Sequence, residues 1–407
     1  MTEETQSSTA PAAAKAETAR APCVLQVLPA LETGGVERGT VDIAEALVVA
    51  GFRSLVASSG GAMTYEIGRA GATHIQLPLA SKNPAVMYAN IGRLAKLIQD
   101  EGVDIVHARS RAPAWSARAA ARRTGRRFVT TFHGTYGHAN AIKRRYNAVM
   151  ASGDIVIAIS NFIGEHARRI YAVDPARLRV IPRGVDLALF DRRKVSADRI
   201  VQLARQWRLP DGVPVVMLPG RLTRWKGQTV LIDAMRILTG RRPGRLRCLL
   251  VGADQGRAAY RAELERRARG AGLTDSVHIV DHCNDMPAAL MLADVVVSAS
   301  TDPEAFGRVA AEAQAMGRPV VATDHGGARE TVIAGETGWL VPPGDAGALA
   351  DAIETALDLD GGARDILADK AVTHAVASYS KTAMCARTLE VYRALLDADA
   401  RPGPKAV

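Results

Sequence analysis

Short apolar runs alternate with helical stretches through the first half of the chain. The runs lie at residues 24–28, 54–57, 75–77, 105–107, 128–132, 155–159 and 178–181. Between the first two, a turn at Thr33-Gly34-Gly35 leads into a stretch of helical character that ends at Gly51. Strands separated by helices favour a parallel sheet that is covered on both faces. Residues 21–190 are therefore expected to form one doubly wound, Rossmann-like α/β domain.

The same pattern begins again after a polar segment, residues 191–212, which is helical in character and is interpreted as a hinge. A second set of apolar runs follows at residues 215–218, 246–251, 277–280, 295–299 and 320–323. From about residue 370 the chain has the pattern of a long amphipathic helix or helix pair. We predict a second doubly wound domain over residues 213–375 and a C-terminal helix and tail over residues 376–407. Ligands of such sheets bind at the carboxyl ends of the strands, so a cleft between the domains is the expected site.

The composition is that of a soluble globular protein with more than one core. The chain has 407 residues, of which 48% are hydrophobic and 23% charged. Its four cysteines are scattered without metal-like spacing, which favours a reducing, cytoplasmic compartment. No apolar run approaches the ~20 residues of a membrane span. Residues 1–20 lack the hydrophobic core of a signal peptide and are expected to be a disordered tail.

The net charge of +10 is concentrated in the first half of the chain. Residues 21–190 contain 21 Lys+Arg against 12 Asp+Glu, a difference of +9. Such a domain could face an anionic membrane or nucleic acid, or its basic residues could simply be solvated helix faces. Only 4% of residues are aromatic and no nucleic-acid-binding motif is present, which speaks against nucleic acid.

Two glutamates carry the most specific chemical signal. Glu304 follows an apolar run, and Glu312 comes eight positions later, within an Ala-rich stretch of helical character. Free N–H groups near Phe306 and Gly307 would open that helix, and such groups attract phosphate or sugar oxygens. Taken alone, Glu304 would be an ordinary acid at a helix start and Glu312 part of a solvated face.

Four further features follow predicted strands. They are the glycine pair Gly34-Gly35; the segment from Pro219 to Gly227, with Arg221 and Lys226; His133, within Thr131-Phe132-His133-Gly134-Thr135; and the segment from Asp324 to Glu330, with two glycines. Glycines let a backbone approach a ligand closely, and paired cations neutralise a diphosphate. Each feature has a plain alternative as a tight turn, a solvated cation or a loop histidine.

Together these segments resemble the retaining glycosyltransferases of family 4, which have the GT-B fold of two Rossmann-like domains facing across a cleft. The resemblance covers nearly the whole chain and is most specific from Glu304 to Val321. It implies that a C-terminal helix crosses back to the first domain. Two positions depart from the family pattern: Ala305 stands where a glycine is usual, and Arg183-Gly184-Val185-Asp186 replaces Asn-Gly-Val-Asp.

The resemblance also implies a role for each site residue. Four residues are expected in catalysis: Glu304, His133, Arg221 and Lys226. Six are expected to bind the donor: Gly35, Gly252, Phe306, Gly307, Glu312 and Glu330. The reaction would be transfer of mannose or another hexose from a nucleotide sugar with retention, with GDP-mannose preferred as donor and UDP-sugars next. No metal ion and no cofactor are implied.

The acceptor is less well specified. Arg109 and Arg111 follow another first-domain strand and could grip a carboxylate or phosphate. This segment is similar to enzymes that build the lipopolysaccharide core, which implies a glycolipid or oligosaccharide acceptor and a place on the inner face of the cytoplasmic membrane. Two alternatives stay open: a sugar-nucleotide epimerase of the same fold, and a non-catalytic basic protein that binds membrane or nucleic acid.

Overall fold

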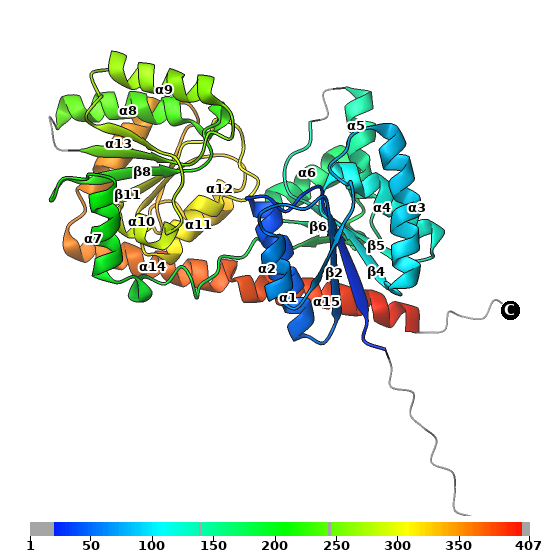
Figure 1. The fold of residues 1–407 in the computed structure, drawn as a ribbon. Coiled ribbons are helices and arrows are strands. Elements are labelled where there is room, and N and C mark those ends of the chain that lie inside the picture. Colours follow the sequence, from blue (N-terminus) through cyan, green and yellow to red (C-terminus); the bar gives the residue numbers. More distant parts are fainter. Residues whose placement is uncertain (1–19, 138–139, 243–245, 401–407) are drawn as a thin grey trace, which may run out of the picture.

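The computed structural model describes residues 20–137, 140–242 and 246–400, which form two α/β domains side by side (Figure 1). Each domain contains one parallel sheet with helices on both faces, so the predicted pair of doubly wound domains is confirmed. The predicted disordered tail lies outside the described residues except for Arg20. The guanidinium of Arg20 lies 3.2 Å from the carboxylate of Asp104.

The first sheet has seven strands in the order β3-β2-β1-β4-β5-β6-β7. Their bounds are β1 Cys23–Val27, β2 Arg53–Ser58, β3 Thr73–Gln76, β4 Ile105–Ala108, β5 Arg127–Phe132, β6 Ile155–Ala158 and β7 Leu178–Val180. Every neighbouring pair is parallel. The strand order reverses between β1 and β4, and such a switch point opens a crevice at the carboxyl ends of the strands.

The second sheet has six strands in the corresponding order, β10-β9-β8-β11-β12-β13. Their bounds are β8 Val215–Pro219, β9 Arg247–Val251, β10 Val277–Val280, β11 Val295–Ser298, β12 Val320–Thr323 and β13 Trp339–Val341. The sequence pattern missed β13, because three residues between Gly338 and Pro342 are too short to show a periodicity. Its switch point lies between β8 and β11.

Fifteen α-helices are found in the described residues. Those of the first domain are α1 Gly35–Val49, α2 Thr64–Arg69, α3 Pro84–Asp100, α4 Arg111–Arg123, α5 Ala141–Asn147 and α6 Asn161–Tyr171. Those that follow are α7 Ala197–Gln206, α8 Gln228–Arg241, α9 Ala258–Gly270, α10 Met286–Leu292, α11 Arg308–Ala315, α12 Ala328–Thr331, α13 Ala346–Leu357, α14 Gly361–Tyr379 and α15 Lys381–Ala400. No helix within the described ranges is both long enough and apolar enough to span a bilayer.

Alternate residues of the first sheet serve two different cores. Val24 packs with Ile43 of α1 and Tyr392 of α15 on one face, whereas its neighbour Leu25 belongs to the core that includes Leu94 of α3 on the other. Strands buried on both faces read as continuous apolar runs. The apolar run at residues 24–28 therefore indicated a strand correctly, although apolar and polar residues do not alternate in it.

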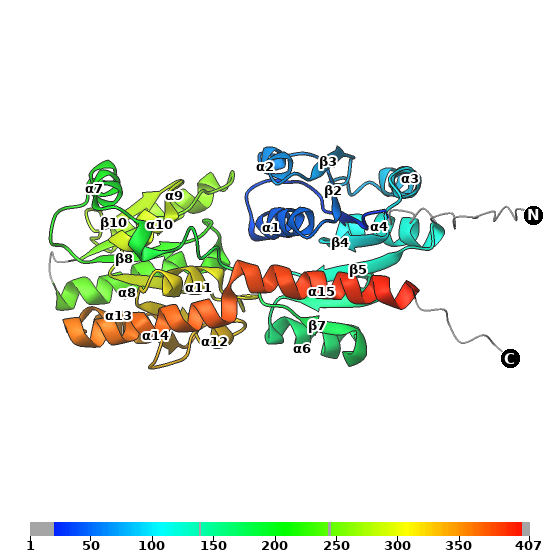
Figure 2. The ribbon, with the colours of Figure 1, turned by 90° about the horizontal axis from the view of Figure 1, so that it is seen from below.

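The two C-terminal helices lie on different domains. Helix α14 runs along the second domain and α15 runs along the first, end to end with it (Figure 2). The side chain of Tyr392 on α15 is fully buried, and its hydroxyl lies 2.6 Å from Nδ1 of His107 in β4. The predicted C-terminal helix that crosses back to the first domain is thus confirmed.

The segment interpreted as a hinge contains a helix of its own. Residues 191–212 include α7, whose Leu203 is buried in the main apolar core. The guanidinium of Arg199 on α7 donates to both carboxylate oxygens of Asp285, at 2.8 and 2.6 Å. Because Asp285 is the residue before α10, α7 is attached to the second domain.

Candidate active site

A large cleft lies where the carboxyl ends of the two sheets meet. Its volume is about 860 Å³, which is ample for a nucleotide and a sugar. The first domain contributes the turn from Thr33 to Val36 after β1 and the segment from His133 to Thr135 after β5. The second domain contributes the segments that follow β8, β9 and β11. The cleft thus joins both topological switch points.

Lys226 and Glu304, two oppositely charged residues of the second domain, meet at the cleft wall. The ammonium group of Lys226 donates to Oε1 of Glu304, and the hydroxyl of Ser300 donates to the same oxygen at 2.6 Å. The Lys226 nitrogen also lies 4.5 Å from the ring centre of Trp225. Both charged side chains are mostly buried, at 16% and 11% exposure. Such a pair interacts more strongly than one in bulk water.

Helix α11 presents its N-terminus to the same cleft. Gly307 precedes the helix with φ of 87° and no side chain caps the first turn, so the leading N–H groups keep their capacity to bind an anion. Behind this turn, Gly327 donates its N–H to the carbonyl of Glu304 at 2.7 Å. A Cβ atom on Gly326 would lie 2.5 Å from that carbonyl. The two glycines therefore support the Glu304 loop from behind.

A second glycine pair shapes the floor of the cleft. A Cβ atom on Gly252, after β9, would lie 2.1 Å from the carbonyl oxygen of Gly220, after β8. The two strand-end loops thus approach more closely than any side chain would permit. Arg221 follows Gly220 on this floor and is exposed. Its side chain has no hydrogen-bond or ion-pair partner among the described residues. A guanidinium in this state is available to an incoming anion.

On the first domain, His133 is held by a neighbouring arginine. Arg183 donates from one guanidinium nitrogen to Nδ1 of His133 at 2.8 Å and from the other to the carbonyl of Gly35. Burial, followed by the charges of Arg183 and Arg109, lowers the pKa of His133 well below its usual value. Burial, followed by the charge of Arg308, lowers the pKa of Arg183 to about 9. His133 is therefore neutral at physiological pH.

Comparison with known proteins identifies the family to which this two-domain chain belongs. The family described as Glycosyltransferase Family 4 matches residues 33–189, and the family described as Glycosyl transferases group 1 matches residues 201–373. The crystal structure of a glycosyltransferase from Rickettsia africae is similar with 35% identity and a TM-score of 0.85, over 92% of this chain and 99% of that one. The chain belongs to the family 4 and group 1 glycosyltransferases.

Further relatives of this glycosyltransferase bind or are named for defined ligands. The structure of Anabaena HepE in complex with UDP-glucose has 25% identity and a TM-score of 0.81, over 91% of this chain and 99% of that one. The D-inositol 3-phosphate glycosyltransferase of Xylanimonas cellulosilytica has 36% identity over 217 residues, 52% of this chain and 51% of the relative. The chain spans about half the length of the curated relatives it matches.

The structure gathers most of the predicted site residues of this glycosyltransferase in one place. Eight of the twelve line the cleft: Gly35, His133, Arg221, Lys226, Gly252, Glu304, Phe306 and Gly307. Their roles stay predictions. Among the described residues, no group of three or more His, Cys, Asp and Glu side chains is placed to hold a metal ion.

The other four predicted residues do not line the cleft. Glu312 lies one helical turn into α11 and accepts a hydrogen bond at 2.5 Å from Nε of Arg308, which does line it. Arg109 is 5% exposed and lines a smaller cavity beneath the cleft together with His133. Arg111, at the start of α4, lies 4.5 Å from the ring centre of Tyr136.

Glu330 does not line the cleft; it forms a contact between the two domains. Its carboxylate accepts hydrogen bonds from the backbone N–H groups of Asn161 and Phe162, at 2.8 and 2.6 Å. These N–H groups open α6 of the first domain, where a negative charge is favoured. The hydroxyl of Ser160 donates to the carbonyl of Ala305 at 2.6 Å beside them. Glu330 thus ties the two domains together at the edge of the site.

Two arginines of the cleft have no role predicted from the sequence. In the sequence Arg183 stands out only as a departure from the family pattern and Arg308 carries no assigned role, yet both line the cleft. The signal for Arg183 was the arginine in place of the family asparagine. Its partners at Gly35 and His133 are 148 and 50 positions away along the chain, so no local pattern could have revealed them.

Proposed function

We propose that this glycosyltransferase moves a hexose from a nucleotide sugar to a glycan, glycolipid or phosphorylated polyol acceptor with retention of configuration. One observation carries the proposal: the exposed guanidinium of Arg221 and the Lys226–Glu304 pair share a cleft wall with the open N-terminus of α11. Cations and free N–H groups suit a diphosphate, and a carboxylate suits sugar hydroxyls.

In this mechanism Arg221 and Lys226 hold the diphosphate and stabilise the negative charge that grows on it as the glycosidic bond breaks. Such electrostatic stabilisation is usually the largest single contribution to catalysis. Glu304 and the N–H groups at Phe306 and Gly307 position the donor sugar. The departing phosphate oxygen accepts the proton of the acceptor hydroxyl on the same face of the sugar, which gives retention. No cofactor and no metal ion are needed for this step.

Glu304 and Glu312 do not act as a hydrolytic pair in this proposal. A glycosidase needs two carboxyl groups on opposite sides of one bond. Here Oε1 of Glu312 is occupied by Arg308, and Glu312 is not part of the cleft wall. Glu312 is assigned to the ribose hydroxyls, which it reaches once Arg308 turns towards the bound nucleotide.

The donor is proposed to be a UDP-sugar or GDP-mannose. The complex of Anabaena HepE with UDP-glucose supports a UDP-sugar. GDP-mannose rests on the resemblance of the sequence to the family alone. The experiment is calorimetric titration with UDP-glucose, UDP-galactose, UDP-N-acetylglucosamine and GDP-mannose, with Glu312→Gln as the variant. Selective binding of one donor, weakened about tenfold in Glu312→Gln, supports the proposal; absence of binding by folded protein contradicts it.

The acceptor is proposed to carry a negative charge. The curated relatives are named for D-inositol 3-phosphate, a phosphorylated polyol, and the first domain carries the excess of basic residues. Lipopolysaccharide core is the second acceptor class. Product analysis with each acceptor, and with none, separates transfer from epimerisation, because an epimerase would change the donor without an acceptor.

Attachment to the membrane surface is proposed for the first domain. Helix α5 carries Lys143, Arg144 and Arg145 beside Ile142, whose side chain is 82% exposed. Basic residues near an anionic bilayer contribute about 1 kcal/mol each. Co-sedimentation with vesicles containing phosphatidylglycerol, lost at high salt, is the expected result; equal recovery with neutral vesicles would contradict it.

A further inference from the structure

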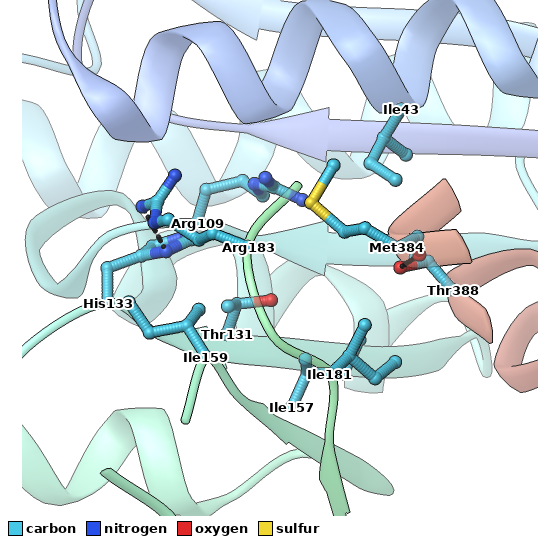
Figure 3. A pocket seen from close by; sticks show the side chains of 10 residues that line it. All are labelled: Ile43, Arg109, Thr131, His133, Ile157, Ile159, Ile181, Arg183, Met384 and Thr388. Carbon is cyan, nitrogen blue, oxygen red and sulfur yellow. Dashed lines mark hydrogen bonds between the residues drawn. The ribbon is translucent and has the colours of Figure 1, made fainter. Parts of the chain in front are cut away.

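Arg183 occupies an unusual position between three parts of the molecule. It lies in the chain segment that leaves the first domain after β7, and its guanidinium reaches back to the turn after β1 and to the end of β5. Figure 3 shows it beside His133 and Arg109, with the side chains of Met384 and Thr388 of α15 on the other side of the small cavity. One side chain thus links two loops of the cleft.

The backbone next to Arg183 is held by the junction of α14 and α15, residues 379–381, where the chain returns from the second domain to the first. Val185 donates its N–H to the carbonyl of Tyr379 at 2.6 Å, and Lys381 donates to the carbonyl of Val185 at 2.9 Å. A Cβ atom on Gly184 would lie 2.4 Å from Cα of Lys381, so only glycine fits there. The base of the Arg183 side chain is therefore set by the packing of the two segments that join the domains.

The contact of Arg183 with His133 determines which ring nitrogen carries the proton. A guanidinium nitrogen can only donate, so Nδ1 of His133 is the acceptor and the neutral ring is protonated at Nε2. Nε2 is buried and has no hydrogen-bond partner among the described residues. A buried donor without a partner is costly, and His133 lines the cleft. The Nε2–H group is therefore the part of the ring that is available to donate a hydrogen bond to a ligand.

We propose that Arg183 is a positioning residue: it holds His133 as the neutral Nε2–H tautomer and fixes the Gly35 turn, so that the first-domain wall of the cleft is set before substrate enters. The role of His133 towards the sugar rests on the proposed function, whereas the tautomer does not. Because Gly184 and Val185 pack on the crossing at residues 379–381, the arrangement also couples His133 to the relative position of the domains.

The first test reads the tautomer directly. The long-range ¹H–¹⁵N spectrum of histidine-labelled protein distinguishes the two neutral forms, and His133→Gln assigns the signal. The charged or titratable groups that face this ring are Arg183, Arg109 and His107. We expect the Nε2–H form in the wild type at pH 7, and a mixed or inverted tautomer in Arg183→Met. The same spectrum in both proteins would overturn the proposal.

The second test separates positioning from folding. Arg183→Met should lower kcat by about 100-fold, the scale of a misplaced catalytic group, with donor KM changed by less than about threefold. Arg183→Lys, which keeps the charge and one donor, should recover part of kcat. Arg179→Met is the matched control, because Arg179 is exposed on β7 and its guanidinium donates, among the described residues, to the carbonyls of Ala176 and Leu178 alone. Unchanged kcat in Arg183→Met would overturn the proposal.

The two tests fail in different ways. If the wild type transfers no sugar from any donor, the proposed function fails, and the spectrum still decides the tautomer. If transfer is observed and the spectrum of Arg183→Met equals that of the wild type, the proposed function stands and the positioning role of Arg183 is rejected.

Discussion

Lys226 and Glu304 neutralise each other across the cleft wall through a direct hydrogen bond from the ammonium group to Oε1. The proposed mechanism assigns the two residues to different parts of the donor, Lys226 to the diphosphate and Glu304 to the sugar. Their pairing keeps two mostly buried charges compensated while no ligand is present, which avoids the cost of an isolated buried charge. A donor that brings its own anion and hydroxyl groups can take over each partner in turn.

Replacing Lys226 tests this pairing. In Lys226→Ala the diphosphate loses one cation and Glu304 loses its main partner, so we expect turnover to fall by two orders of magnitude or more, equivalent to at least ~2.7 kcal/mol of transition-state stabilisation. Initial rates at saturating donor measure this. Arg224→Gln, in the same loop but paired with Glu263 at the surface, should keep its rate. Wild-type turnover in Lys226→Ala would reject the assignment.

The Glu330 carboxylate gives a test that distinguishes structure from donor binding. Glu330→Gln keeps an acceptor but loses the charge at the start of α6, and we expect the protein to lose about 1 kcal/mol of stability. Thermal unfolding should show a lower Tm, and donor affinity should stay within about threefold. If instead donor affinity falls tenfold with unchanged Tm, Glu330 binds the donor as the sequence predicted.

Asp42 should make stability depend on pH. Burial raises its pKa to about 6, compared with about 3.9 for a free aspartate. The folded protein thus binds this proton more tightly than the unfolded chain, so the stabilisation is complete below about pH 4 and is lost as pH rises through 6. Asp42→Asn should therefore gain about 3 kcal/mol relative to wild type between pH 4 and 8.

Urea unfolding at several pH values measures that gain. Asp100→Asn is the control, because Asp100 is an exposed residue that pairs with Lys96 on the same helix. The effect of this substitution should not vary over the same pH range by more than a few tenths of a kcal/mol. A difference between Asp42→Asn and wild type that is constant with pH would contradict the expectation.

Charge reversal at Arg111 tests the acceptor side. Arg111 lies over Tyr136 and donates to Asn147 at 3.2 Å, with no acidic partner in the described part of the chain. We expect Arg111→Glu to raise the acceptor KM about tenfold through repulsion of an anionic acceptor, with donor affinity unchanged. Arg122→Glu, at the exposed end of the same helix, should change neither. Equal loss of donor and acceptor affinity would exclude this role.

Most strands, and the location in the cleft of eight of the twelve predicted site residues, were predictable from the sequence. Apolar runs such as residues 24–28 are long enough to be recognised, and the residue after each run falls at the carboxyl edge of a parallel sheet. His133, Arg221 and Glu304 each follow such a run, so their common location in the cleft follows from the fold class. The strand β13 was missed because its three residues are too few to show a pattern of apolar and polar positions.

The chain itself therefore determined the domain type, the order of elements and the loops that meet at the cleft, because these depend on local patterns of apolar and polar residues. Only the tertiary structure decided which side chains bond to one another. The pairing of Lys226 with Glu304, of Arg183 with His133, and of Glu330 with the start of α6 joins residues 50 to 169 positions apart. Contacts at that separation depend on how the two sheets and the crossing segments pack, which no local pattern encodes.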